Sequence, residues 1–133
     1  MNEVMNAILT RRSIRKFTDA PIPKEILKDI LDAALHAPSG KAMQTWQFTM
    51  ITNKDMISRL IEAIGKELGR DGYDMYHPTA ILMTSNVTNG TWSREDNACA
   101  LEMPFWLPTP TVSDPYGLIK CWKSVMRRPS APF

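Results

Sequence analysis

Cysteine and histidine are scarce in this chain, which has two of each among its 133 residues. Cys99 and Cys121 form no C-x-x-C pair, and His36 and His77 are distant from both in the sequence. A structural zinc site is therefore not expected, and no metal ligands are assigned. The two thiols are expected to be reduced, as they are in cytoplasmic proteins.

Long apolar runs are also missing. No stretch approaches the roughly 18 to 20 apolar residues that a membrane-spanning helix needs, and the opening Met1-Asn2-Glu3-Val4 does not resemble a signal peptide. A cytoplasmic location is therefore expected. Neither sign of charge dominates, because 16 basic and 14 acidic side chains leave a net charge of +2. The balance of charge thus argues neither for nor against an anionic partner.

The composition that is present, 44% hydrophobic and 23% charged, is ordinary for one globular domain. Apolar residues recur at helical spacing in residues 3–11 and in a longer stretch that begins at Lys24, includes Leu35 on its apolar face and ends before Pro38. Asn53 can cap a further helix, whose predicted apolar stripe begins with Met56. The pattern predicts three amphipathic helices in the first half of the chain.

Two segments are rich in residues that favour strands. Residues 45–52 alternate apolar and polar side chains, and residues 79–84 form a short apolar run typical of a buried strand. A further helix is expected over residues 93–102, opened by Ser93 and Asp96 in a capping-box arrangement. After it the pattern changes: residues 104–133 contain six of the ten prolines, and neither helix nor strand is expected there. Pro104 should end the preceding helix.

The first cluster with chemical potential reads Arg-Arg-Ser-Ile-Arg-Lys-Phe over residues 11–17. Planar guanidinium groups and a hydroxyl at a helix end suit a phosphate or an electron-rich ring. Taken alone, such a cluster is more often a solvated group of cations that complements the helix dipole. Nucleic-acid binding is a weaker alternative, supported only by this cluster and four later cations, Lys120, Lys123, Arg127 and Arg128.

The second cluster reads Ala-Pro-Ser-Gly-Lys-Ala-Met-Gln-Thr-Trp over residues 37–46. It joins a helix exit to a strand entry through small side chains, which allow backbone groups to approach a ligand closely. Ser39 and Gln44 offer hydrogen bonds to such a ligand. The alternative is a plain helix C-terminus with Trp46 in the core.

Together the two clusters resemble the nitroreductase family, whose opening pattern is Arg-Arg-Ser-x-Arg-x-Phe, a helix ending in Ala-Pro-Ser-Gly, and a Gln-Pro-Trp-x-Phe strand. Residues 11–17, 37–40 and 44–48 follow that pattern in order. The segment 76–81 resembles the entry to the family's next strand, and residues 96–102 resemble the start of its central helix. The resemblance covers roughly residues 3–102. Ala42 and Thr45 depart from it, because the family commonly has Asn and Pro there.

The resemblance implies an α+β fold, a mixed sheet flanked by helices that is incomplete at the C-terminus, in an intertwined homodimer with FMN at the interface. It implies that one subunit holds the FMN phosphate and pyrimidine edge, through Arg11, Arg12, Ser13 and Arg15. The other subunit approaches the same flavin through Pro38, Ser39, Gly40 and Gln44.

By the family's chemistry, FMN takes a hydride from NADH or NADPH and reduces a nitroaromatic, quinone-like or related electron-poor substrate. No catalytic side chain is assigned, because the flavin carries the reaction. The alternative is an inactive, truncated fragment that binds flavin weakly or not at all.

Residues 103–133 do not follow the family pattern, so we expect residues 1–102 to be the N-terminal part of an FMN-binding domain and the rest to be a proline-rich tail. Back-translated and read one base out of register, residues 103–118 can encode Asn-Ala-Ile-Leu-Ala-Ala-His-Thr-Tyr-Gly-Ile-Gly-Ser-Val-Trp-Ile, which resembles the family's continuation. The hypothesis is that one adenine has been lost beside the Glu102 codon and the tail is out of frame. A natural proline-rich extension is the alternative.

Overall fold

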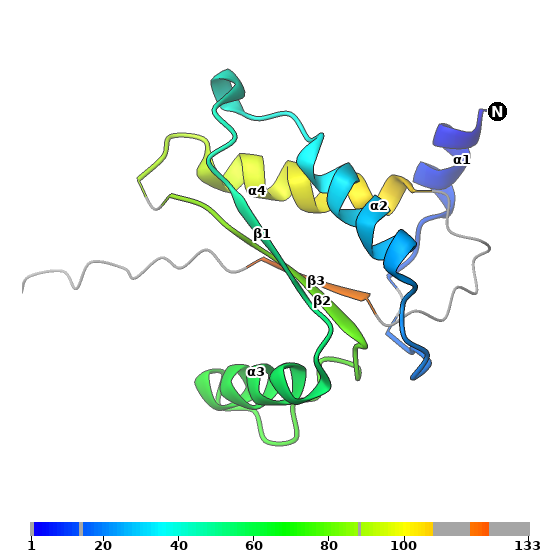
Figure 1. Cartoon of the computed structure of the whole chain (residues 1–133), viewed down its shortest axis with the longest axis vertical. Coiled ribbons are helices and arrows are strands. Elements are labelled where there is room, and N and C mark those ends of the chain that lie inside the picture. Colours follow the sequence, from blue (N-terminus) through cyan, green and yellow to red (C-terminus); the bar gives the residue numbers. More distant parts are fainter. Residues whose placement is uncertain (1, 14, 88, 108–117, 123–133) are drawn as a thin grey trace, which may run out of the picture.

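The structure, a computed structural model, describes residues 2–13, 15–87, 89–107 and 118–122. It is an α+β arrangement in which helices flank a small sheet (Figure 1). The elements are α1 (Glu3–Thr10), α2 (Lys24–Leu35), the 3-10 turn η1 (Gly40–Ala42), β1 (Gln47–Ile51), α3 (Lys54–Glu67), β2 (Ala80–Ser85), α4 (Ser93–Glu102), the 3-10 turn η2 (Met103–Trp106) and β3 (Leu118–Trp122).

The sheet has three described strands in the order β1-β2-β3. β1 runs antiparallel to β2, with Thr49 opposite Met83, whereas β3 runs parallel to β2, with Leu118 opposite Ala80. The sheet is therefore mixed, and the predicted fold class is confirmed. β2 lies between the other two strands. It is a nearly continuous apolar run, as expected of a strand that packs on both faces.

Each face of β2 packs against a different helical layer. Successive strand residues point to opposite faces, so Leu82 joins a core cluster with Ile30 and Ala34 of α2 and Leu101 of α4. Ile81 points the other way and packs with residues of α3 and β1 in a second cluster. Figure 1 shows α2 and α4 together on one side of the strands and α3 on the other.

The predicted helices and strands of residues 3–102 are present, with shifts of one or two residues at several ends. Asn53 caps α3 as expected, its Oδ1 accepting a hydrogen bond from the Met56 N–H at 3.0 Å. Two side chains assigned to apolar faces lie outside the core instead: Met56 is 56% exposed and Leu35 is 48% exposed. Both stand at the margin of their helix's apolar stripe, where helical spacing alone does not separate core from surface.

The tail differs in part from the sequence prediction. α4 ends at Glu102 as expected, and Pro104 is buried in η2 directly afterwards. The prediction that residues 104–133 contain no strand is wrong, because Leu118–Trp122 forms β3 beside β2. β3 completes an edge that the β2 backbone would otherwise leave unpaired. Lys123, Arg127 and Arg128 lie outside the described residues.

None of the described helices is both long enough and apolar enough to cross a membrane.

Candidate functional site

The first candidate cluster follows α1 as non-helical chain. α1 ends at Thr10, and Arg11 begins the exit with φ −52° and ψ 135°. The Arg12 guanidinium donates to the Arg11 carbonyl at 2.8 Å and to the Leu9 carbonyl at 3.1 Å, so it covers the C-terminal carbonyls of the helix. Arg11, Arg12, Ser13 and Arg15 are all exposed to solvent.

Arg15 has an aromatic neighbour that the sequence reasoning did not identify. Its guanidinium carbon lies 6.0 Å from the centroid of the Tyr76 ring, at the outer limit of a cation–π contact. Tyr76 is held in a left-handed backbone conformation, φ 62°, and its N–H donates to Asp74 Oδ1 at 2.9 Å. Residues 11–15 thus sit close to the loop that precedes β2, although 60 residues separate them in the sequence.

The positive charge of this cluster is not neutralised within the described part of the chain. Two ion pairs are found there, Lys28 with Asp32 at 2.6 Å and His77 with Asp74 at 3.2 Å, and neither includes an arginine of the cluster. Exposed guanidinium groups without a carboxylate partner remain available to an anionic ligand.

The second candidate cluster is a strained loop. Lys41, Ala42 and Gln44 have φ values of 56°, 55° and 46°, in the left-handed region that non-glycine residues rarely adopt. Each such residue costs on the order of 1–3 kcal/mol and persists only when its surroundings hold it. Within the loop, the Gln44 N–H donates to Ser39 Oγ at 3.2 Å. Ser39 and Gln44, both predicted site residues, are thereby brought together, beside an exposed Pro38.

The N-terminal end of α4 clamps this loop at Gly40. Asp96 is only 5% exposed, and its Oδ1 accepts a hydrogen bond from the Gly40 N–H at 2.8 Å. A Cβ added to Gly40 would overlap the Trp92 ring, so the position requires glycine. The predicted capping box is wrong: Trp92 occupies the N-cap, Ser93 Oγ has no hydrogen-bond partner, and Asp96 binds the loop instead of the helix. A carboxylate near a helix N-terminus is favourable in either role.

A chain of polar side chains anchors the other end of the loop. Thr45 donates to Asn86 Oδ1 at 2.7 Å, and the Asn86 amide donates to Asn97 Oδ1 at 3.3 Å. Asn97 also accepts from the Thr84 hydroxyl at 3.1 Å. Thr84 is 0% exposed and Asn97 is 1% exposed, and buried polar groups are retained when they are hydrogen-bonded. Sequence reasoning missed this network, since its only signal is polar residues at positions that periodicity assigns to the core.

A cavity of about 250 Å³ lies between the loop and the start of α4. Its walls combine backbone, aromatic and aliphatic surface with one buried carboxylate. The lining residues include Gly40, Met43, Thr45, Trp92 and Asp96.

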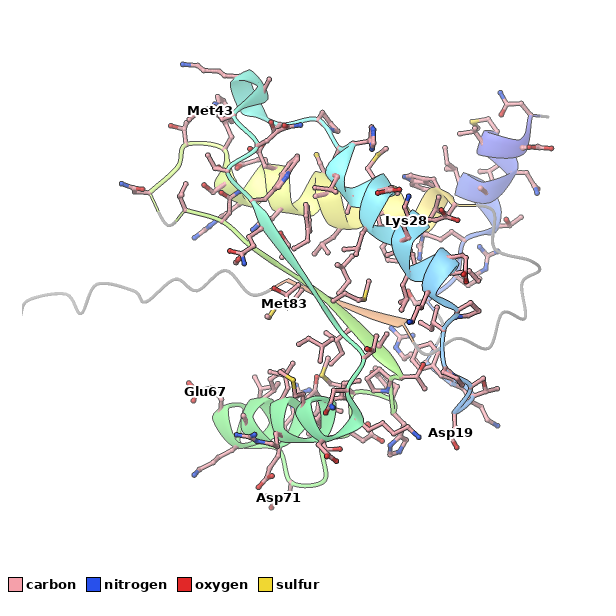
Figure 2. All side chains as sticks on the ribbon, in the orientation of Figure 1. Asp19, Lys28, Met43, Glu67, Asp71 and Met83 are labelled. Atoms are coloured by element: carbon pink, nitrogen blue, oxygen red, sulfur yellow. The ribbon has the colours of Figure 1, made fainter. Side chains whose placement is uncertain are left out.

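One copy of the chain does not bring the two clusters together. In Figure 1 the segment after α1 lies at one end of the α2 and α4 pair, and the loop at residue 40 lies at the other. The same separation is visible in Figure 2, where Met43 of the loop and Asp19, four residues after Arg15, lie at opposite ends of the described molecule. The two clusters of one copy therefore do not form a single site in the described part of the chain.

Comparison with known proteins gives this arrangement its family. The sequence profile of the nitroreductase family matches residues 8–111, more than three quarters of the chain. The chain belongs to the nitroreductase family. The match includes both candidate clusters and the whole of α2, β1, α3, β2 and α4.

The matches to individual nitroreductase-family relatives are shorter, and each covers only part of the relative's own sequence. A protein of Methanothermobacter thermautotrophicus, provisionally assigned as an NADH dehydrogenase/NAD(P)H nitroreductase, is 42% identical over 60 residues, which are 45% of this chain and 31% of the relative. Iodotyrosine deiodinase 1 of Rattus norvegicus is 34% identical over 65 residues, 49% of this chain and 23% of the relative. The chain thus spans about a third or less of the curated relatives that it matches.

The fold of this nitroreductase-family chain has solved counterparts. A nitroreductase with bound FMN from Bacteroides fragilis superposes with a TM-score of 0.72 at 32% identity, covering 80% of this chain and 64% of that one. The agreement confirms the nitroreductase-like fold that the motifs predicted.

Proposed function

We propose that this chain forms the cofactor-binding part of an FMN-dependent oxidoreductase that takes electrons from NADH or NADPH. The proposed acceptors are nitroaromatic, quinone-like or related electron-poor molecules. The observation that carries the proposal is the exposed arginine cluster, whose charge no described carboxylate neutralises. The FMN bound to the Bacteroides fragilis relative supports the choice of ligand.

The residues present fit the two ends of FMN. Arg11, Arg12 and Arg15 would hold the phosphate and the pyrimidine edge, with Ser13 as a neutral donor. Ser39, Gly40 and Gln44 would approach the ring from the strained loop, whose shape at Gly40 depends on the absence of a side chain, because a Cβ there would overlap the Trp92 ring. When bound, FMN supplies hydride transfer between the nicotinamide and the acceptor. The protein's own groups bind the phosphate, orient the ring and limit the access of water.

The separation of the two clusters supports a homodimer with two equivalent sites. A two-fold interface places the arginine cluster of one copy beside the loop of the other, and the symmetry repeats the arrangement. The face of α1 is consistent with such a contact, because none of its residues is buried within the chain and Val4, Ile8 and Leu9 are exposed. Apolar helix faces of this kind are commonly covered by a partner.

A flavin spectrum tests the proposed function directly. Protein mixed with FMN and passed through a desalting column should keep one flavin per chain, seen as the yellow absorbance of bound flavin. Anaerobic NADH or NADPH should then bleach this absorbance, because hydride transfer reduces the ring. A colourless protein after desalting would contradict FMN binding. Retained flavin that neither nicotinamide bleaches would contradict the electron donor only.

Replacing Arg15 with alanine should weaken FMN binding. The change removes a charge-assisted hydrogen bond worth roughly 1.5–3 kcal/mol, which corresponds to a loss of about ten- to a hundredfold in affinity. Titration of FMN by the change in its fluorescence measures the effect. Arg59→Ala, which removes an exposed arginine from α3, is the matched control and should leave the affinity unchanged. Equal affinity of the Arg15 variant and the control would contradict the assignment of Arg15.

A further inference from the structure

Hydrogen bonds from side chains of other segments hold the loop of residues 39–45 at each of its two ends. At the first end, the buried Asp96 accepts the Gly40 N–H at 2.8 Å. At the second end, Thr45 donates to Asn86, which is itself bound to Asn97. Between the anchors, three non-glycine residues adopt left-handed backbone conformations. A strained segment held at both ends by side chains from other elements is a typical feature of a ligand-binding position.

We propose that Asp96 and the pair Thr45–Asn86 are positioning residues that hold this loop in its ligand-binding shape. They act on the loop backbone and not on a ligand. The inference rests on the proposed function in one respect, that the ligand presented to the loop is FMN. The local claim stands on the hydrogen bonds alone: Asp96 holds the backbone of Gly40, and the Thr45–Asn86 pair holds the chain next to Gln44.

Asp96 is suited to this role because of where its carboxylate lies. α4 places it one turn inside the helix, and the hydrogen bond spans 56 residues of sequence to the loop. A carboxylate that accepts a backbone N–H forms a charge-assisted bond, shorter and stronger than a neutral one. The Trp92 ring packs against the Cα side of the same glycine. The backbone of Gly40 is therefore fixed by a hydrogen bond on its N–H and by a steric contact at its Cα.

Asn86 is suited because its amide has a fixed orientation. Its Oδ1 accepts from the Thr45 hydroxyl at 2.7 Å and from the Val87 N–H at 2.8 Å, so the amide nitrogen must face the other way. There it donates to Asn97 Oδ1 at 3.3 Å. Asn97 is buried against β2 through the Thr84 hydroxyl. Thr45, at the exit of the loop, is thus connected to the centre of the sheet. The Thr45 hydroxyl therefore restrains the loop backbone in addition to the backbone turn itself.

Amide hydrogen exchange in the flavin-free protein tests the local claim. Asp96→Ala should raise the exchange rate of the Gly40 amide by about tenfold or more, because its acceptor is lost. Asp96→Asn keeps an acceptor oxygen and should restore protection. Thr45→Val should raise exchange at the neighbouring Gln44 amide, because the end of the loop that holds this N–H beside Ser39 Oγ loses its bond to Asn86, and Thr45→Ser should restore protection. The Leu82 amide, in the buried central strand, reports any general loosening and should be unchanged.

FMN titration of the same variants tests the connection to the ligand. Asp96→Ala and Thr45→Val should each weaken FMN binding by about tenfold, with rescue by Asp96→Asn and Thr45→Ser. Asp71→Ala, at an exposed carboxylate in the loop after α3, is the matched control. Unchanged exchange at Gly40 and Gln44 in folded variants would overturn the positioning role. Should Asp96→Ala fail to fold, Thr45→Val carries the same test.

The outcomes separate the inference from the proposed function. If the unaltered protein binds no FMN while exchange at Gly40 rises in Asp96→Ala, the proposed function fails and the positioning of the loop stands. If the unaltered protein binds FMN and the variants bind it equally well despite faster exchange, the proposed function stands and the positioning role toward FMN is wrong.

Discussion

Co-expression of two flavin-deficient variants of this chain is expected to restore about a quarter of the flavin sites. The first variant, Arg11→Ala with Arg15→Ala, lacks two guanidinium groups of the exposed cluster. The second, Gly40→Val, places a branched side chain where even a Cβ overlaps the Trp92 ring. Each variant expressed alone should bind little FMN, since every site in its homodimer is defective.

The expected recovery follows from the separation of the two clusters. In a mixed dimer, one site combines the intact arginine cluster of one copy with the intact loop of the other, while the second site carries both defects. Random pairing makes about half of the dimers mixed, and half of the sites in those dimers are intact. The fraction of chains that retain FMN after desalting measures the recovery.

Two outcomes would contradict this arrangement. No recovery in mixed dimers isolated by differently tagged chains would mean that both clusters serve a site within one chain. Full flavin content in either variant alone would remove the altered residues from the site. Pairing of the Arg59→Ala chain with Gly40→Val provides the control, since every mixed dimer should then contain one intact site, as with the unaltered chain.

Much of the fold could be predicted from the sequence because local patterns determine it. The buried run at residues 79–84 is β2 with a one-residue shift, and Asn53 caps α3 through its own side chain. Pro104 has no N–H to donate, and α4 ends two residues before it. Each of these features depends on neighbours within a few residues. The resemblance to the family likewise rested on short motifs that follow one another along the chain in the order typical of the family.

The contacts that shape the candidate site could not be predicted in this way. Ser93 and Asp96 match a capping box locally. Asp96 nevertheless binds Gly40, which is 56 residues away in sequence, because the packing of α4 against the start of the loop brings them together. Asn97 and Thr84 pair for the same reason. β3 was missed because a strand that only completes the edge of a sheet needs little periodicity of its own. These features depend on tertiary pairing, for which the sequence carries no local signal.

The reading-frame hypothesis yields the other large expected effect. Inserting one adenine after the Glu102 codon of the native coding DNA should replace Met-Pro-Phe-Trp-Leu-Pro with Asn-Ala-Ile-Leu-Ala-Ala. This stretch has no proline and strong helix formers, so α4 should continue by about two turns instead of ending at Glu102. The helix would then bury additional apolar residues beside α2, where Leu107 and its neighbours now pack.

The frame-restored chain is expected to bind FMN at least about tenfold more tightly than the present chain. A tenfold gain corresponds to the free energy of about one additional good hydrogen bond. It should also gain NAD(P)H-dependent reduction of an electron-poor acceptor. Inserting a whole codon at the same place is the matched control, because it adds one residue while leaving the tail unchanged. Flavin content, turnover and protease resistance beyond residue 102 are compared among the three proteins. If the present chain binds FMN and turns over as well as the frame-restored protein, and its tail resists proteolysis equally, the proline-rich sequence is a functional part of the protein, with β3 as the element that anchors it to the sheet.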